Sequence, residues 1–151
     1  MKLKYLALSV CAAALMSCNS DKPVAADPTL KDILGNKFLV GVAINSEQAA
    51  GRDTSAVDVV RRHFNSIVAE NCMKSEVIHP EEDRYDFSLA DKFVKFGEDN
   101  GMFIIGHCLV WHSQLSPWFC VDAEGKNVSP EILKERLKSH IPVSYTHLTL
   151  P

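Results

Sequence analysis

The sequence predicts an α/β fold in which parallel strands alternate with helices. Three apolar segments, at 38–44, 64–68 and 102–105, are each followed by a segment with helical spacing. Such continuous apolar runs are typical of strands buried on both faces of a parallel sheet. Long loops follow the second and third runs, and loops in these positions face the active site of βα folds. The pattern leaves open whether the sheet closes into a barrel or remains an open, doubly wound sheet.

Composition excludes some classes of function. The 151 residues are 46% hydrophobic and carry a net charge of -3, which is ordinary for a globular domain. The charges are mixed along the chain, and no basic stripe could follow a phosphate backbone, so we expect no nucleic-acid partner. No GxGxxG or P-loop pattern follows the first apolar run, which argues against nucleotide binding. We expect no cofactor.

The N-terminus has the pattern of an export signal. Lys2 and Lys4 precede an apolar run, Tyr5–Met16, that is shorter than the roughly 20 residues of a membrane-spanning helix. The sequence ending at Cys18 resembles a bacterial lipoprotein cleavage box. We therefore predict a lipoprotein signal peptide at 1–17, a lipid anchor on Cys18, and a tether with the segment leading into the fold at 18–37. The protein would then be exported and held at the cell envelope by its lipid. An ordinary signal peptide, with secretion, is the alternative.

The first βα unit begins with the predicted strand 38–44. Thr54 or Ser55 can cap the following helix, whose apolar positions are Ala56, Val57, Val60 and Phe64. Residues 64–68 then form the second predicted strand, and a long polar connection covers 71–87.

The second helix is expected to start at Ser88, with Asp91 in a near capping box, and to end at Asn100-Gly101. Its buried face is marked by Leu89, Phe93 and Phe96. The third predicted strand, 102–105, leads into a loop at 107–128. Ser129 caps and Pro130 opens a last helix, whose apolar face carries Leu133, Leu137 and Ile141.

Three cysteines lie outside the export segment, at 72, 108 and 120, without the CxxC spacing of a zinc knuckle. Cys72 and Cys108 each follow a predicted strand, so a disulfide between them is one hypothesis. Free, partly buried thiols are the alternative.

Polar side chains gather after the second and third predicted strands. They are Glu70, Asn71 and Lys74 in the first loop, and His107, Trp111, His112 and Gln114 in the second. Amides and carboxylates bond neighbouring hydroxyls, and an indole ring suits the apolar face of a pyranose, so the set fits a neutral sugar. Each residue alone could be structural. A metal site through His107 and His112 is a second alternative, although their spacing matches no HExxH helix.

Four segments taken together carry a family resemblance. They are GVAIN at 41–45, FNSIVAENCMK at 64–74, HPEEDRYDF at 79–87 and GHCLVWHSQLSPW at 106–118. In this order they resemble glycoside hydrolase family 10, the endo-1,4-β-xylanases, whose fold is the (β/α)₈ TIM barrel. The resemblance covers 38–141, which would hold about the first three βα units of the catalytic barrel.

The resemblance implies binding of xylan or xylo-oligosaccharides and hydrolysis of internal β-1,4 bonds with retention of configuration. Glu70, Asn71 and Lys74 would bond sugars on the non-reducing side of the cut. His107 and Trp111 would contact the ring at the cleaved bond, and Gln114 would reach neighbouring hydroxyls. Asn45 lies at the same rim. Ser75 departs from the family, which commonly has an aromatic residue there.

The catalytic carboxylates of the family are not expected within these residues. Retaining glycosidases need two carboxyl groups about 5 Å apart. Glu70 and Glu76 match binding or structural positions, so we nominate no catalytic residue. The family pattern stops after Ile141, and we interpret 142–151 as cloning or adaptor sequence. We therefore expect the 151 residues alone to be inactive. The alternatives are a non-catalytic glycan-binding lipoprotein and a metal-dependent hydrolase.

Overall fold

A three-stranded parallel sheet forms the centre of the molecule. The computed structural model describes residues 27–35 and 37–149, so the predicted signal peptide and Cys18 lie outside the described residues. Strands β1 (Gly41–Ile44), β2 (Ser66–Ala69) and β3 (Phe103–Ile105) stand in the order β1-β2-β3. In register, Gly41 lies opposite Ser66, and Ser66 lies opposite Phe103. The predicted parallel sheet is confirmed.

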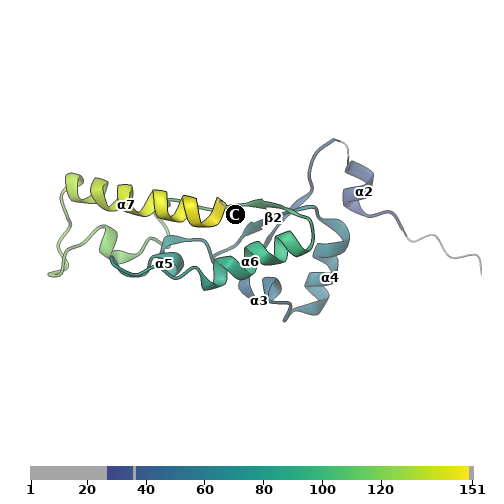
Figure 1. Ribbon diagram of the computed structural model, residues 1–151, viewed down its shortest axis with the longest axis horizontal. Helices are drawn as coiled ribbons and strands as arrows, with labels where there is room; N and C mark the ends of the chain where they lie inside the picture. Colours follow the sequence, from purple (N-terminus) through teal and green to yellow (C-terminus); the bar gives the residue numbers. More distant parts are fainter. Residues whose placement is uncertain (1–26, 36, 150–151) are drawn as a thin grey trace, which may run out of the picture.

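Helices connect and flank these strands (Figure 1). They are α2 (Leu30–Leu34), α3 (Ser46–Ala49), α4 (Thr54–His63), α5 (Ser75–Ile78), α6 (Ser88–Asp99), the 3-10 helix η1 (Pro117–Phe119) and α7 (Pro130–Thr149). The last turn of α7 ends beside the sheet, while its first turns extend beyond it (Figure 1). Within the described ranges, none of the helices has the length and apolar character needed to cross a membrane.

The core lies between the sheet and helices α4 and α6. Val57 and Val60 of α4 are buried, as predicted, and so are Phe93 and Phe96 of α6. Helix α6 approaches the sheet closely at Gly97, where an added Cβ would lie 2.6 Å from Cγ1 of Ile104. A glycine at this position lets the helix rest directly on β3, which fixes where the loop after β3 begins.

The prediction that the first strand is buried on both faces is wrong. Phe38 and Leu39 precede β1 and are 58% and 51% exposed, and only Ile44 of the strand is buried. On β3, Phe103 and Ile105 are also exposed, while Ile104 packs against the core. The sheet is therefore covered on its helix side, and its other face presents apolar side chains.

Two predicted helix caps are replaced by neighbouring residues. Asp53, and not Thr54 or Ser55, caps α4, since its side chain accepts from the amide of Ala56 at 3.3 Å. Helix α6 begins after Phe87 without the predicted capping box, and Asp86 accepts from the amide of Ser88 at 3.0 Å instead. A carboxylate just before a helix accepts a hydrogen bond from a backbone amide that has no partner within the helix. Its negative charge also interacts favourably with the positive end of the helix dipole.

The predicted end of α6 and the predicted cap of α7 are confirmed, whereas the predicted disulfide is not formed. Asn100 ends α6 and Gly101 adopts a left-handed φ of 60°, as the Asn-Gly pair indicated. The hydroxyl of Ser129 accepts from the amide of Ile132 at 3.4 Å, which confirms the predicted cap. Cys72 and Cys108 are free thiols, so the disulfide hypothesis is wrong. Helix α7 continues through Pro142 to Thr149.

Candidate functional site

The loops after β2 and β3 meet at the carboxyl edge of the sheet. The amide of Glu70 continues the sheet by donating to the carbonyl of Ile44 at 3.0 Å. The loop then turns into α5, where the amide of Glu76 donates to the carbonyl of Gln114 at 3.1 Å. A backbone hydrogen bond thus joins two residues that are 38 positions apart in the sequence. This hydrogen bond between the two loops brings the predicted polar residues to one rim of the sheet.

Lys74 is the centre of the polar cluster. Its side chain is buried, and its Nζ donates to Oδ1 of Asn71 at 2.9 Å and to Oε1 of Gln114. Gln114 Nε2 in turn donates to Oδ1 of Asn71 at 3.2 Å and to Oε1 of Glu76 at 3.3 Å. Neutral amide oxygens, rather than a carboxylate, therefore accept from the Lys74 ammonium, which has a third N–H for another acceptor.

Trp111 lies over this cluster. The Lys74 Nζ is 4.7 Å from the centroid of the indole ring, within cation–π range. The ring of His107 stands edge-on to Trp111 with centroids 6.2 Å apart. Trp111 is 39% exposed and His107 is also exposed, so both rings are open to a ligand. The charge of Lys74 also reaches Cys108, where burial raises the pKa of the thiol and the ammonium partly opposes that rise.

Gln114 takes its place through an uncommon backbone conformation. Its φ is 55°, the left-handed region that side-chain-bearing residues rarely adopt. This turn points the amide side chain at Lys74 while the backbone carbonyl faces α5. Strain held by surrounding contacts is a feature of functional sites. The His107–Cys108 peptide bond in the same segment is cis.

Ser75, which we noted as a departure from the family pattern, ties the two loops together. Its hydroxyl donates to the carbonyl of Gln114 at 3.3 Å and accepts from the amide of Ser116 at 3.3 Å. Ser116 then donates through its hydroxyl to the carbonyl of His79 at 2.7 Å. Sequence reasoning missed Ser116, since a lone serine before proline carries no distinctive signal.

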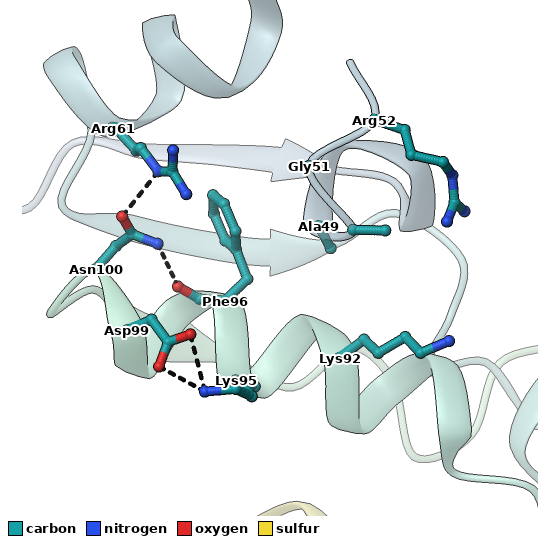
Figure 2. A pocket seen from close by; sticks show the side chains of 10 residues that line it. Ala49, Gly51, Arg52, Arg61, Lys92, Lys95, Phe96, Asp99 and Asn100 are labelled. Carbon is teal, nitrogen blue, oxygen red and sulfur yellow. Dashed lines mark hydrogen bonds and ion pairs between the residues drawn. The ribbon is translucent and has the colours of Figure 1, made fainter. Parts of the chain in front are cut away.

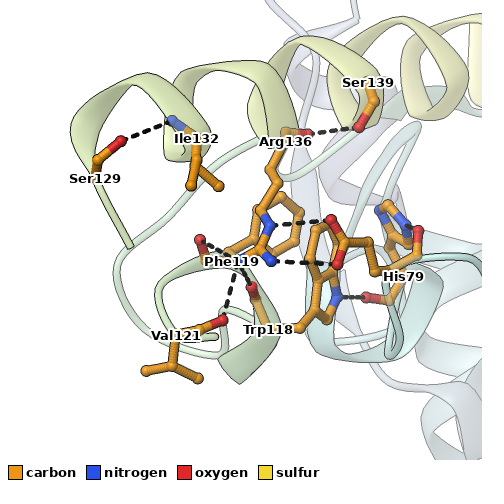
Figure 3. Close-up of polar contacts among 9 residues, drawn as sticks. His79, Trp118, Phe119, Val121, Ser129, Ile132, Arg136 and Ser139 are labelled. Atoms are coloured by element: carbon orange, nitrogen blue, oxygen red, sulfur yellow. Dashed lines mark hydrogen bonds and ion pairs between the residues drawn. The ribbon is translucent and has the colours of Figure 1, made fainter. Parts of the chain in front are cut away.

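Trp118 and Arg136 fix the far end of the loop (Figure 3). Trp118 Nε1 donates to the carbonyl of His79 at 3.0 Å, and the Arg136 guanidinium lies over its ring. Arg136 also donates to the carbonyls of Trp118 and Val121 and pairs with Glu82 at 3.0 Å. These groups lie away from the Lys74 cluster, so they support the loop rather than line the site.

Three residues considered from the sequence stay outside the cluster. Glu70 is exposed, and its side chain has no partner among the described residues. Asn45 uses its Oδ1 to cap α3, accepting from the amides of Glu47 and Gln48 at 3.0 Å each. The His112 ring stands edge-on to Trp111, with centroids 5.5 Å apart. Residues 27–35 and 37–149 contain no grouping of three or more potential metal ligands.

A separate cavity of about 450 Å³ lies on the helix side of the sheet, between α3, α4 and α6 (Figure 2). Two of the cations that line it, Arg61 and Lys95, have polar partners of their own. Arg61 donates to Asn100 at 3.0 Å above the Phe96 ring, and Lys95 pairs with Asp99 at 2.8 Å. None of the predicted sugar-binding residues lines it. The arrangement that fits a carbohydrate is the exposed aromatic and amide rim at the sheet edge.

Parallel βα units with polar and aromatic side chains at the carboxyl edge of the sheet are the architecture in which (β/α)₈ barrel enzymes carry their active sites. Residues 29–150 match the sequence profile of glycosyl hydrolase family 10. An endo-1,4-beta-xylanase A of Xylanibacter ruminicola is 53% identical over 123 residues, which are 79% of this chain and 33% of that protein. The chain belongs to glycosyl hydrolase family 10.

Solved structures agree with this assignment. A family 10 structure from Paenibacillus barcinonensis superposes with a TM-score of 0.73 at 36% identity, covering 80% of this chain and 35% of that one. A mutant structure in complex with xylotriose gives 0.71 at 34% identity, covering 80% and 35%. The chain therefore has the N-terminal βα units of the (β/α)₈ barrel. It spans about a third of the length of these relatives.

Proposed function

We propose that this chain forms part of an endo-1,4-β-xylanase and supplies one wall of its xylan-binding cleft. Asn71, Lys74 and Gln114 bond the hydroxyls of xylose units on the non-reducing side of the cleaved bond, with Glu70 beside them. His107 and Trp111 contact the ring at that bond. We assign no catalytic carboxylate to the chain, so hydrolysis belongs to the whole enzyme and sugar positioning to these residues.

The observation that carries the proposal is the shared hydrogen bonding of Lys74, Asn71 and Gln114 beneath the exposed Trp111 ring. Donors and acceptors that are already oriented by each other lose little freedom when a sugar binds. An indole face beside them suits the C–H face of a pyranose. The membership of family 10, and a related structure in complex with xylotriose, support xylan as the glycan.

Xylotriose titration followed by tryptophan emission tests this proposal, since Trp111 is exposed and next to the cluster. We expect saturable quenching by xylotriose that is absent in the Trp111→Phe variant. We expect Lys74→Met to weaken the affinity about tenfold, equivalent to about 1.4 kcal/mol. Lys134→Met, an exposed lysine of α7, is the matched control and should bind as the wild type does.

Four outcomes are informative. Xylotriose binding that is weakened by Lys74→Met and unchanged by Lys134→Met supports the proposed wall of the xylan-binding cleft. Binding that Lys74→Met leaves unchanged would place the sugar elsewhere, and no binding by folded protein would contradict the proposal. Equal affinity for cellotriose would support a general β-1,4-glycan site and count against xylan as the specific substrate.

We also propose that the protein is exported and anchored through Cys18. The support is the charged start, the short apolar run and the cysteine at its end. Incorporation of labelled palmitate in a bacterial host tests it. Label should enter the wild type and disappear in Cys18→Ser, and equal labelling of both would contradict the anchor.

A further inference from the structure

Two histidines meet edge to edge through their Nδ1 atoms, beside the loop that carries His107 and Trp111. His79, at the end of α5, and His140, on α7, are 1% and 0% exposed. Their ring centroids are 5.2 Å apart with 16° between the planes, and their Nδ1 atoms are 3.0 Å apart. Trp118 and Phe119 pack edge-on to His79 (Figure 3), and Tyr85 stacks on the same ring with centroids 3.7 Å apart. The sugar wall described above uses neither histidine.

The outer nitrogen of each ring faces a backbone carbonyl. His79 Nε2 is 3.0 Å from the carbonyl oxygen of Glu82, and His140 Nε2 is 2.9 Å from that of Leu109. Leu109 lies between His107 and Trp111, in the segment that carries both rings of the candidate site. The histidine pair therefore contacts the backbone of the sugar-site loop directly.

Proton counting decides how the pair is arranged. Burial lowers the pKa of both rings, so each is neutral at neutral pH and carries one N–H. Carbonyl oxygens only accept, so two protons must serve three contacts. The Ser144 hydroxyl, 3.3 Å from His140 Nδ1, brings its own proton and can donate to this nitrogen, which favours Nδ1 as the acceptor and Nε2 as the N–H of His140. We therefore assign the chain of donors as His79 Nδ1–H to His140 Nδ1, and His140 Nε2–H to Leu109.

We propose that His140, oriented by His79, is a positioning residue that holds the Leu109 carbonyl and thereby sets the places of His107 and Trp111 for the sugar. The role rests on the proposed function, since positioning matters only if these rings meet a glycan. It is the arrangement in which a second polar group fixes the tautomer of a working histidine. The nearby charged residues Arg136 and Glu82 pair with each other, so neither takes the place of His79 beside His140.

The test compares four variants of the full chain by hydrogen exchange and xylotriose affinity. His140→Phe keeps a ring in the packed space but cannot donate to Leu109, so exchange should rise in residues 106–113 and affinity should fall about tenfold. His140→Gln places an amide N–H near the position of Nε2 and should restore most of both. His79→Phe should have an intermediate effect. The His79→Phe/His140→Phe double variant should lose no more affinity than His140→Phe alone, since the two residues act in series.

Exchange of the strand segments 41–44 and 66–69 is the internal control. A purely structural role would raise exchange there as well, and would make the double variant worse than either single one. That result, or equal behaviour of His140→Phe and His140→Gln, would overturn the proposal. If the wild type fails to bind xylotriose, the proposed function fails, and loop exchange still decides whether His140 holds the loop.

Discussion

The Lys74 ammonium lies 4.7 Å from the centroid of the Trp111 indole ring and donates to Asn71 and Gln114 below it. This one side chain joins the loop after β2 to the loop after β3. Because it is buried, its hydrogen bonds stabilise the fold as well as the rim of the site. A substitution of Lys74 is therefore expected to alter both the stability of the fold and the binding of a sugar.

Replacing Lys74 by Met should reduce the free energy of unfolding by about 1–3 kcal/mol. The methionine fills the space, but the partly buried Oε1 atom of Gln114 loses its charged donor, and loss of such a hydrogen bond costs about that much. Urea denaturation measures the change. Lys134→Met removes an exposed lysine and should leave the midpoint unchanged. Equal stability of the Lys74 variant would show that the cluster contributes nothing to folding.

The left-handed backbone of Gln114 gives a second prediction. Both Gln114→Ala and Gln114→Gly lose the side-chain bonds, but glycine adopts the observed φ of 55° without strain. The alanine variant should therefore be less stable than the glycine variant by about 1 kcal/mol. At the neighbouring Ser113, whose φ is ordinary, glycine should be no better than alanine. The same order at both positions would argue against strain at Gln114.

Gly97 gives a third prediction. An added Cβ would lie 2.6 and 2.7 Å from Cγ1 and Cδ1 of Ile104, so Gly97→Ala should separate α6 from β3. We expect a loss of about 1–3 kcal/mol, despite the better helix propensity of alanine. Gly106→Ala is the control, because its Cβ would meet open space. Thermal unfolding measures both, and a Gly97→Ala midpoint at or above that of the wild type would contradict the close contact.

Acid should weaken the fold through the histidine pair. Burial lowers the pKa of His79 and His140 below the ordinary value near 6.5, so the unfolded chain binds more protons as the pH falls. The stability they contribute is present above that value and is lost as the pH decreases below about 6.5 toward the lowered pKa values of the folded state. Each extra proton gives a slope of about 1.4 kcal/mol per pH unit. His140→Phe should show a shallower slope, and an unchanged slope would mean that other groups titrate.

Much of the fold could be predicted from local patterns. The parallel strands follow from the apolar runs, and the Asn100-Gly101 and Ser129-Pro130 pairs marked helix ends because their chemistry acts within a few residues. The caps of α4 and α6 were missed by one or two positions, since Asp53 and Asp86 compete with nearby serines and threonines for the same amides. The exposure of Phe38 and Phe103 depends on what covers the sheet, which no local pattern contains.

The residues of the candidate site could be predicted from the sequence, but the contacts that hold them in place could not. Asn71, Lys74, Trp111 and Gln114 were expected at one rim, and the structure brings them together. Ser116 and the His79–His140 contact are distant in sequence and carry no signal of spacing. Such contacts arise only after the loops and α7 have packed, so they require the structure.

The most direct test of the account is a chimera in which residues 29–141 replace the matching segment of the Xylanibacter ruminicola endo-1,4-beta-xylanase A, with which the chain is 53% identical. If these residues form the xylan-binding wall, the chimera should release xylo-oligosaccharides from xylan. Its Lys74→Met variant should have a kcat/KM at least tenfold lower, while Lys134→Met should not. A chimera that folds cooperatively but leaves xylan intact, or whose activity is indifferent to Lys74→Met, would contradict the account.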